Sequence, residues 1–187
     1  MEYRKLPHGS ERISVIGLGT SVVGEHSVQN VVETVTFALD SGVNYIDLAG
    51  GHAAIFPGIG EALAGRRKDA YVQLHFGADY TSGEYGWDRV KKSVAWQLEQ
   101  LKTDYIDFGF MHCLDEIGDL EDYERNGILH YLLDLKAQGV VRHIGLSTHA
   151  PKLANRVLDM GILDMMMFSI NPMYDYGHGE FSIGSAS

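Results

Sequence analysis

The chain has 187 residues, 45% of them hydrophobic, and 25 acidic against 15 basic side chains give it a formal net charge of −10. This balance, without a long run of Lys and Arg, excludes nucleic acid as an expected partner. The longest apolar stretches, such as "MMMFSI", are too short to cross a membrane, and "MEYRKLPHGSER" lacks the apolar segment of a signal peptide. We therefore expect a cytoplasmic protein. The single Cys113 excludes an intrachain disulfide and a cysteine metal cage.

Short apolar runs alternate with segments of helical period, which is typical of β/α units and a parallel sheet. Ahead of them, polar turn residues in "YRKLPHGSERISVI" predict a small β-hairpin outside the main sheet. The strands of the sheet are expected at residues 13–18, 44–48, 71–76, 105–111, 142–146 and 162–170. Residues 1–187 are predicted to form a single domain, with 175–187 as a loop or disordered tail.

Two parallel architectures fit this order of elements, the doubly wound sheet and the barrel. A doubly wound dinucleotide domain needs a GxGxxG turn after its first strand, and the glycines of "GLGTSVVG" miss that spacing. A barrel instead collects polar residues at the carboxyl ends of its strands. Such residues are Asp47, His75, His112, Ser147, His149 and Asn171. We therefore predict an α/β fold of the (β/α)8 TIM-barrel type with about six units present, an incomplete barrel.

Asp47 in "NYIDLAGGH" stands in an otherwise apolar strand. A carboxylate near the mouth of an apolar barrel is costly unless a cation or hydrogen-bond donors meet it. The histidines at neighbouring strand ends are candidate partners. The alternative is that Asp47 accepts hydrogen bonds from backbone N–H groups of the following loop. The residues alone leave both interpretations open.

Several segments resemble the aldo-keto reductases, in that family's order and over residues 3–174. They are "GLGT", "NYIDLA", "GEALAGRR" leading to "VQLHFG", "SVAWQLEQLKTDYIDFGFMH" and "GVVRHIGLST". The resemblance implies an NADPH-dependent (β/α)8 barrel that reduces small aldehydes and ketones. "YRKLPHGSERISVIGLGT" and "HFGADYTSGEYGW" resemble a bacterial subgroup whose longer members carry a C-terminal ferredoxin-like 4Fe-4S extension, and this chain has no ligands for that cluster.

The resemblance also implies the catalytic residues. The family uses an Asp, a Tyr five residues later, a Lys ending the third strand and a His ending the fourth. Asp47 and His112 match the Asp and the His, whereas His52 stands in place of the Tyr and His75 in place of the Lys. One rewiring has His52 as the acid and His75 as its charge partner, because an imidazolium has an ordinary pKa of about 6.5 and a nearby carboxylate raises such a value. Tyr80 and Tyr85, in the loop after the third strand, stay as alternative donors of a phenolic proton.

The cofactor residues implied by the resemblance lie at three strand ends. They are Gly19, Thr20, Ser147, Thr148 and Asn171. Thr148 replaces the family's Asn, and the Gln of the sixth strand falls on Met167, which cannot make the same hydrogen bond. The last two units of the family barrel hold the cofactor phosphates, so six units imply a truncated cofactor site and a possible fragment of a longer protein. The choice between NADPH and NADH stays open.

Two alternatives from other classes also stay open. His75, His112 and His149 end consecutive strands near Asp47, a set that suits Zn²⁺ or Fe²⁺. The other is a non-catalytic truncated remnant. In either case an incomplete barrel has unpaired edge strands, and pairing with another copy in a homo-oligomer would cover them.

Overall fold

The computed structural model describes residues 1–187 except 22, 24–26, 49–53, 78–86, 113 and 171–187. The predictions for His52, Tyr80, Tyr85, Asn171 and the tail 175–187 therefore fall outside the described residues. No helix in the described part of the chain is long and apolar enough to cross a membrane.

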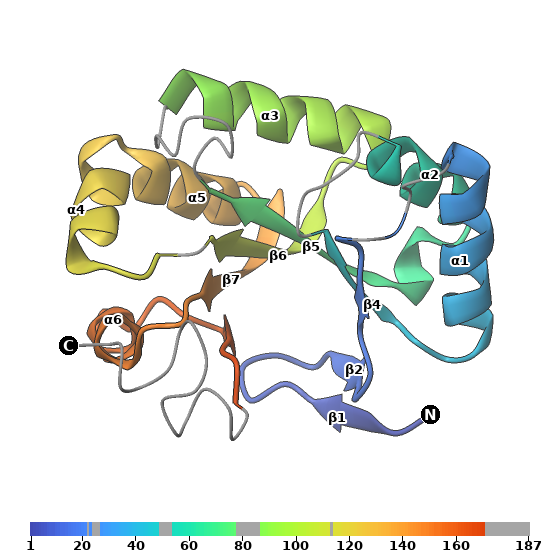
Figure 1. The fold of residues 1–187 in the computed structure, drawn as a ribbon, viewed down its shortest axis with the longest axis horizontal. Helices are drawn as coiled ribbons and strands as arrows, with labels where there is room; N and C mark the ends of the chain where they lie inside the picture. The colour runs from blue at the N-terminus through green and yellow to red at the C-terminus, as the bar shows by residue number, and fades with distance from the viewer. Residues whose placement is uncertain (22, 24–26, 49–53, 78–86, 113, 171–187) are drawn as a thin grey trace.

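The described residues form an N-terminal hairpin and a six-stranded parallel sheet (Figure 1). The hairpin pairs β1 (Tyr3–Lys5) with β2 (Arg12–Ser14) in antiparallel fashion. The sheet follows chain order, with strands β3 (Leu18–Gly19), β4 (Tyr45–Leu48), β5 (Tyr71–Phe76), β6 (Ile106–Met111), β7 (Val141–Ser147) and β8 (Met165–Met167).

Helices connect these strands and lie on the outside of the curled sheet (Figure 1). They are α1 (Val28–Asp40), α2 (Ile55–Ala62), the 3-10 helix η1 (Arg67–Asp69), α3 (Trp87–Gln100), α4 (Ile117–Arg125), α5 (Ile128–Ala137) and α6 (Pro151–Leu158). Parallel strands in chain order with crossover helices on one side make a curled half-barrel. The predicted incomplete (β/α)8 barrel with its hairpin is confirmed.

Two of the expected strands differ from the observed ones by more than one residue at an end. The single strand expected at 13–18 is divided between β2 of the hairpin and β3 of the sheet. Side-chain bonds interrupt it, because the Ser14 hydroxyl donates to the Ile16 carbonyl at 2.7 Å and the Ser14 amide donates to Asn44 Oδ1 at 2.8 Å. The strand expected at 162–170 is shorter, and only β8 is paired in the sheet.

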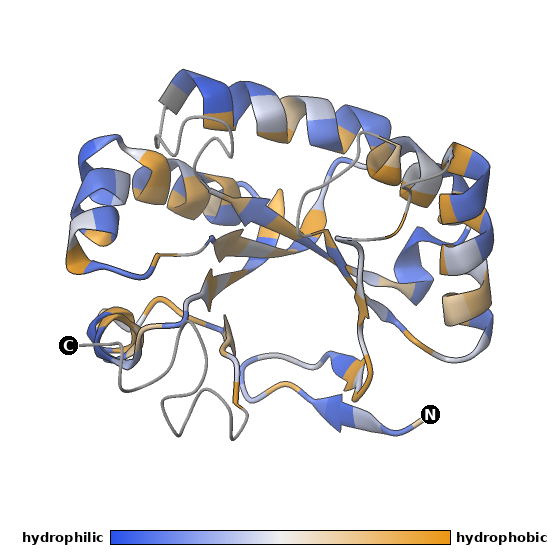
Figure 2. Cartoon of the chain, in the orientation of Figure 1, coloured by the Kyte–Doolittle hydropathy of each residue, from blue (hydrophilic) through white to orange (hydrophobic). Residues whose placement is uncertain are grey.

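Hydrophobic residues recur along the strands (Figure 2), and they form two clusters, as expected for a parallel sheet covered by helices. On the outer face, the helices and strands share a large core that includes Val35, Ile59 and Leu132. On the inner face lies a smaller aromatic cluster made of Ile13, Tyr45, Phe108 and Phe110. The polar residues described below are therefore set above an apolar barrel interior.

One charged cluster ties the amino ends of the central strands together. Asp107 on β6 is 2% exposed and accepts hydrogen bonds from Arg67 at 2.8 Å, Arg142 at 3.0 Å and the Val72 amide at 2.9 Å. Both guanidinium groups also stack on the Tyr105 ring. The cluster lies at the end of the sheet opposite to the candidate site, so its role is to hold β5, β6 and β7 together.

Candidate active site

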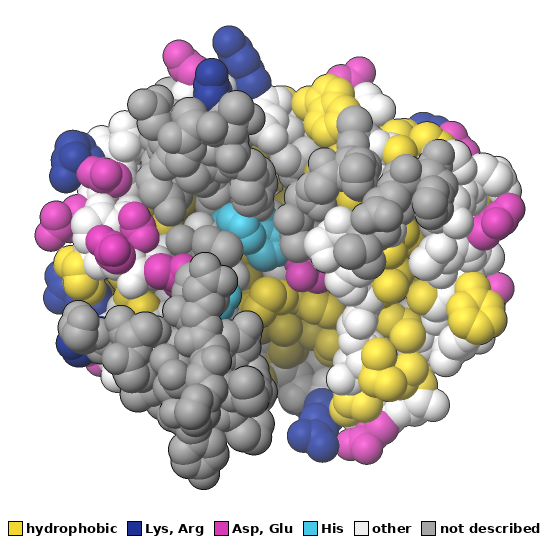
Figure 3. Space-filling model, in the orientation of Figure 1, with side chains coloured by type: hydrophobic (Ala, Val, Ile, Leu, Met, Phe, Trp, Pro, Cys, Tyr) yellow, Lys and Arg dark blue, Asp and Glu magenta, His cyan; other side chains and the backbone are white. Residues whose placement is uncertain are grey.

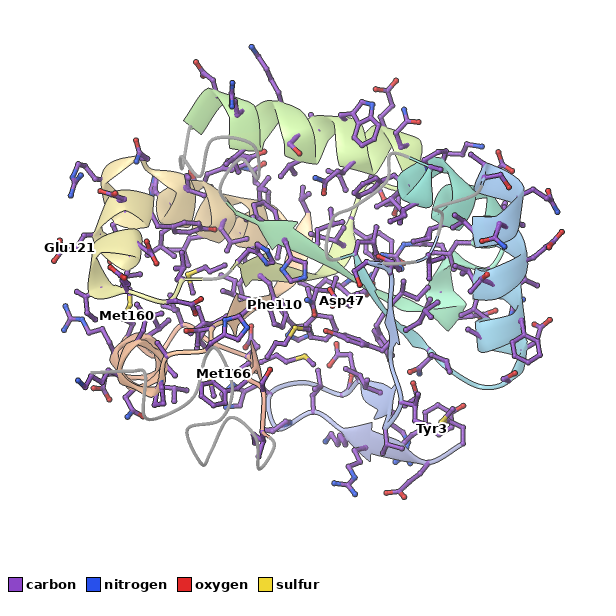
Figure 4. The ribbon with its side chains drawn as sticks, in the orientation of Figure 1. Tyr3, Asp47, Phe110, Glu121, Met160 and Met166 are labelled. Carbon is purple, nitrogen blue, oxygen red and sulfur yellow. The ribbon has the colours of Figure 1, made fainter. Side chains whose placement is uncertain are left out.

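Three predicted residues meet at the carboxyl ends of neighbouring strands. Asp47 is on β4 and His75 on β5, while His112 follows β6 directly. Histidine side chains gather at the centre of the face shown in Figure 3, beside a hollow lined with hydrophobic side chains. Figure 4 places Asp47 and Phe110 on the inner side of the curled sheet. These three residues therefore lie at the carboxyl-end face of the half-barrel, where barrel enzymes carry their active sites.

Asp47, His75 and His112 form a continuous hydrogen-bonded chain. Asp47 Oδ1 lies 2.6 Å from His75 Nε2, and His75 Nδ1 lies 2.6 Å from His112 Nδ1. The His75 side chain is only 4% exposed and that of Asp47 14%. Both ring nitrogens of His75 are thus engaged, one by a carboxylate and one by an imidazole. Of the two interpretations of Asp47, the described structure favours the one in which a histidine meets the carboxylate.

Burial sets the charge of His112. Burial, followed by the charge of neighbouring His75, lowers the pKa of His112 to about 4. Asp47 and Asp115 act in the opposite direction and do not compensate. At neutral pH His112 is therefore an uncharged imidazole, which carries one hydrogen and has one acceptor nitrogen.

Two residues that were not predicted from the sequence lie next to the hydrogen-bonded chain of Asp47, His75 and His112. Gln73 is fully buried and its Nε2 lies 2.9 Å from both Asp47 Oδ1 and His75 Nε2. Its Oε1 accepts a hydrogen bond from the Tyr45 hydroxyl. Burial, and then the negative charge of Asp47, raise the pKa of Tyr45 well above its ordinary value, so that hydroxyl keeps its proton.

A second carboxylate–imidazole pair follows β6 and β7. Asp115 Oδ2 lies 3.0 Å from His149 Nδ1, and Asp115 Oδ1 accepts from the His149 amide at 2.7 Å and the Thr148 hydroxyl at 3.1 Å. Burial raises the pKa of Asp115, but these hydrogen bonds outweigh burial and leave its pKa below the ordinary value. The sequence reading missed Asp115, although it stands three residues after His112.

The metal-site alternative does not agree with this arrangement. His149 binds Asp115, whereas His75 uses both ring nitrogens for Asp47 and His112. Among the residues that the structure describes, no three His, Cys, Asp or Glu side chains are arranged to hold a metal ion. The four residues are thus divided between the Asp47–His75–His112 chain and a separate Asp115–His149 pair, and among the described residues they do not form a metal centre.

The described cofactor positions fit a nicotinamide in part. Thr20 is fully buried and donates to the Asp47 carbonyl from its amide at 3.1 Å and its hydroxyl at 2.9 Å, which fixes the end of β3 against β4. A Cβ added at Gly19 would meet no described atom within 4 Å, so the backbone there is open to a ligand. The Ser147 hydroxyl makes no hydrogen bond with another described residue. Thr148, in contrast, is committed to Asp115.

A curled parallel half-barrel with ionisable groups at its strand ends is typical of the (β/α)8-barrel class of folds. Residues 15–173 match the aldo/keto reductase family, and the chain belongs to this family. It is 29% identical over 183 residues to an uncharacterized oxidoreductase, YqkF, from Bacillus subtilis, covering 91% of this chain and 57% of that protein. It is 30% identical over 181 residues to L-galactose dehydrogenase from Arabidopsis thaliana, covering 89% and 56%.

Solved structures agree on the fold. Aldo-keto reductase AKR11C1 from Bacillus halodurans in its holo form matches with a TM-score of 0.74 at 24% identity, over 91% of this chain and 58% of that one. An aldo-keto reductase from Klebsiella pneumoniae in complex with NADPH matches with a TM-score of 0.59 at 24% identity, over 79% and 50%. The chain thus spans between half and three fifths of the length of these relatives.

Proposed function

We propose that the protein takes part in NADPH-linked reduction of a small carbonyl compound, with a catalytic set altered at two positions. The observation that carries this proposal is the 2.6 Å contact between His75 Nε2 and Asp47 Oδ1. His75 stands where the family resemblance places a Lys. A protonated imidazole in this contact supplies a positive charge beside the same carboxylate, so the ion pair of the family is kept with a different cation.

His112 and His52 are assigned roles at the substrate carbonyl, beside the Asp47–His75 pair. NADPH, when bound, supplies the hydride that the carbonyl carbon accepts. The carbonyl oxygen then needs a hydrogen-bond donor and a proton as negative charge develops on it. We assign His112 to orient that oxygen, since an uncharged imidazole carries a hydrogen to donate. His52, five residues after Asp47, is proposed as the acid on the basis of this spacing.

Ser147 and the backbone at Gly19 and Thr20 would hold the nicotinamide end of the cofactor. The space beside Gly19 and the Ser147 hydroxyl, neither of them occupied by another described residue, support this assignment. Thr148 would contribute less, because its hydroxyl already binds Asp115. We also propose Asn171 as a carboxamide ligand from its position beyond β8. The Klebsiella pneumoniae relative solved with NADPH supports the choice of cofactor.

The proposal is tested by NADPH fluorescence titration and by reduction of a panel of small aldehydes. We expect His75→Leu to lower kcat/KM by on the order of 100-fold or more, because the charge beside Asp47 is lost. His75→Lys should keep measurable activity, since an ammonium replaces the imidazolium. His130→Gln is a matched control, because His130 is an exposed histidine on α5. Absence of NADPH binding, or full activity in His75→Leu, would contradict the proposal.

His52 needs its own variant. His52→Ala should abolish carbonyl reduction while NADPH binding persists, and His52→Tyr should restore it by supplying the phenol of the family. Carbonyl reduction that survives in His52→Ala would show that another group donates the proton.

We further propose that a second copy of the chain covers the open edges of the sheet. Among the described residues, β3 pairs only with β4, and β8 only with β7. Unpaired edges template association with another chain. Light scattering coupled to size-exclusion chromatography is expected to give at least a dimer, and a monomer at all concentrations would contradict this.

A further inference from the structure

The proposed function leaves the buried pair Tyr45 and Gln73 without a role. We propose that Gln73, oriented by Tyr45, is a positioning residue that keeps the proton of the Asp47–His75 contact on His75 Nε2 and so turns His75 Nδ1 into the proton-exchange partner of His112. The catalytic meaning of this inference rests on the proposed function. The contacts from which the inference is argued do not depend on the proposed function.

The first step is the orientation of the Gln73 amide. Its nitrogen faces the Asp47 carboxylate at 2.9 Å, and its oxygen faces the Tyr45 hydroxyl. The reverse orientation would bring the amide oxygen against a carboxylate oxygen, two acceptors with no hydrogen between them. Tyr45 keeps its proton because burial and the charge of Asp47 both favour the neutral phenol. The hydroxyl therefore remains a donor to Gln73 and holds the amide in place.

The second step is the location of the proton in the Asp47–His75 contact. Asp47 Oδ1 accepts from Gln73 Nε2 at 2.9 Å and faces His75 Nε2 at 2.6 Å; these two nitrogens lie 2.9 Å apart and share Asp47 Oδ1 as their common acceptor. A contact as short as 2.6 Å between an oxygen and a nitrogen requires a hydrogen between them. Because Asp47 Oδ1 already accepts a hydrogen bond from the Gln73 amide, we place the shared hydrogen on His75 Nε2, with Asp47 Oδ1 as the acceptor of both bonds.

The third step concerns the contact between the two imidazoles. With Nε2 of His75 protonated, its Nδ1 faces His112 Nδ1 at 2.6 Å, and one hydrogen lies between these nitrogens. If that hydrogen belongs to His75, neutral His112 carries its own hydrogen on Nε2 and is a donor there. If it belongs to His112, Nε2 of His112 is an acceptor. The two arrangements differ by one proton on the His75 ring. Adding or removing that proton therefore switches His112 Nε2 between hydrogen-bond donor and acceptor, while His112 itself stays uncharged.

A purely structural role for the pair predicts a different outcome in solution. If Tyr45 and Gln73 only fill the barrel interior, their replacement alters stability and leaves the ring protonation of His75 unchanged. The chain offers a close control in Tyr71. This residue is the register partner of Tyr45, and its ring also packs edge-on against Phe108, at 6.5 Å compared with 5.7 Å for Tyr45. Tyr71→Phe thus removes a hydroxyl from the same layer without touching Gln73.

The experiment is nitrogen-15 NMR of the histidine rings in the full chain at pH 7. We expect His75 Nε2 to have the shift of a protonated nitrogen in the unaltered protein and to move toward that of an unprotonated nitrogen in Gln73→Leu. Tyr45→Phe should give a smaller shift in the same direction, and Tyr71→Phe none. An unprotonated His75 Nε2 in the unaltered protein, or the same spectrum in Gln73→Leu and Tyr71→Phe, would overturn the inference. If Gln73→Leu does not fold, Tyr45→Phe decides in the same way.

Carbonyl reduction separates this inference from the proposed function. Where the protein reduces aldehydes, Gln73→Leu should lower kcat on the order of 10-fold at unchanged KM and displace the pH profile, as loss of a residue that orients an imidazole does. If the NMR shifts are as expected but neither the unaltered protein nor any variant reduces aldehydes, the proposed function is refuted and the positioning role of Gln73 is kept. Reductase activity with unchanged NMR shifts would remove the positioning role alone.

Discussion

The low pKa of His112 makes the stability of the fold depend on pH in a calculable way. Burial and the charge of His75 bring this pKa to about 4, whereas an unfolded chain has the ordinary value of about 6.5. Between these two values the unfolded chain binds a proton that the folded chain does not bind. The contribution of His112 is therefore fully present above about pH 6.5 and is lost as the pH falls to about 4.

The loss in the free energy of unfolding can be calculated from the lowered pKa of His112. A decrease from 6.5 to about 4 is about 2.5 units, and each unit corresponds to about 1.4 kcal/mol. Allowing for half-protonation of the folded state at pH 4, the free energy of unfolding should fall by about 3 kcal/mol between pH 7 and pH 4 from this group alone. That is a large part of the stability of an ordinary domain, typically about 5–15 kcal/mol.

The assay is reversible urea unfolding followed by tryptophan fluorescence, for the unaltered protein and for His112→Gln. Other groups also titrate in this interval, so the informative quantity is the difference between the two proteins at each pH. We expect His112→Gln to lose about 3 kcal/mol less than the unaltered protein between pH 7 and pH 4. The exposed His130→Gln should follow the unaltered protein. Parallel curves for the unaltered protein and His112→Gln would refute the argument that His112 is held neutral by burial.

Two further variants test the frame around the site. Asp107→Ala leaves two arginines without their carboxylate and should cost about 3–5 kcal/mol in urea unfolding, whereas Arg142→Ala, whose side chain is 48% exposed, should cost less than about 1 kcal/mol. Equal losses of stability in Asp107→Ala and Arg142→Ala would contradict the expectation that the buried carboxylate contributes more than the exposed guanidinium. Gly145→Ala would place a Cβ 2.2 Å from the Phe110 ring, so we expect a loss of about 1–3 kcal/mol and a lower melting temperature. An unchanged melting temperature would show that Phe110 moves aside freely.

The fold could be predicted because its signal is spread over many residues. Alternating apolar runs and helical periods recur along the chain, and a shift of a few residues at one boundary does not change the order of elements. Boundaries depend on single side chains instead. Ser14 and Asn44 divide the first expected strand by bonds between residues 30 positions apart, and no local pattern reports such a contact.

The candidate site was predictable where a residue ends a strand and not elsewhere. Asp47, His75 and His112 were found because strand ends of a barrel converge. Asp115 lies in a loop beyond β6 and was missed, since its pairing with His149 depends on the path of that loop. Gln73 was missed although the sequence contains a signal for it. Residues two apart in a strand point to the same side, so a polar residue two positions before His75 shares its face.

An imidazole at position 75 differs from a lysine ammonium in its shape as well as in its charge. A lysine ammonium is a single charged group on a flexible stem, and it can bind Asp47 without facing any other residue in a fixed direction. An imidazole is a rigid ring with two nitrogens, so the bond from Nε2 to Asp47 also fixes the direction of Nδ1. In this protein that direction leads to His112 at 2.6 Å. His75→Lys should therefore keep the ion pair but break the connection to His112, and its reductase activity should lose the pH dependence that the histidine pair imposes.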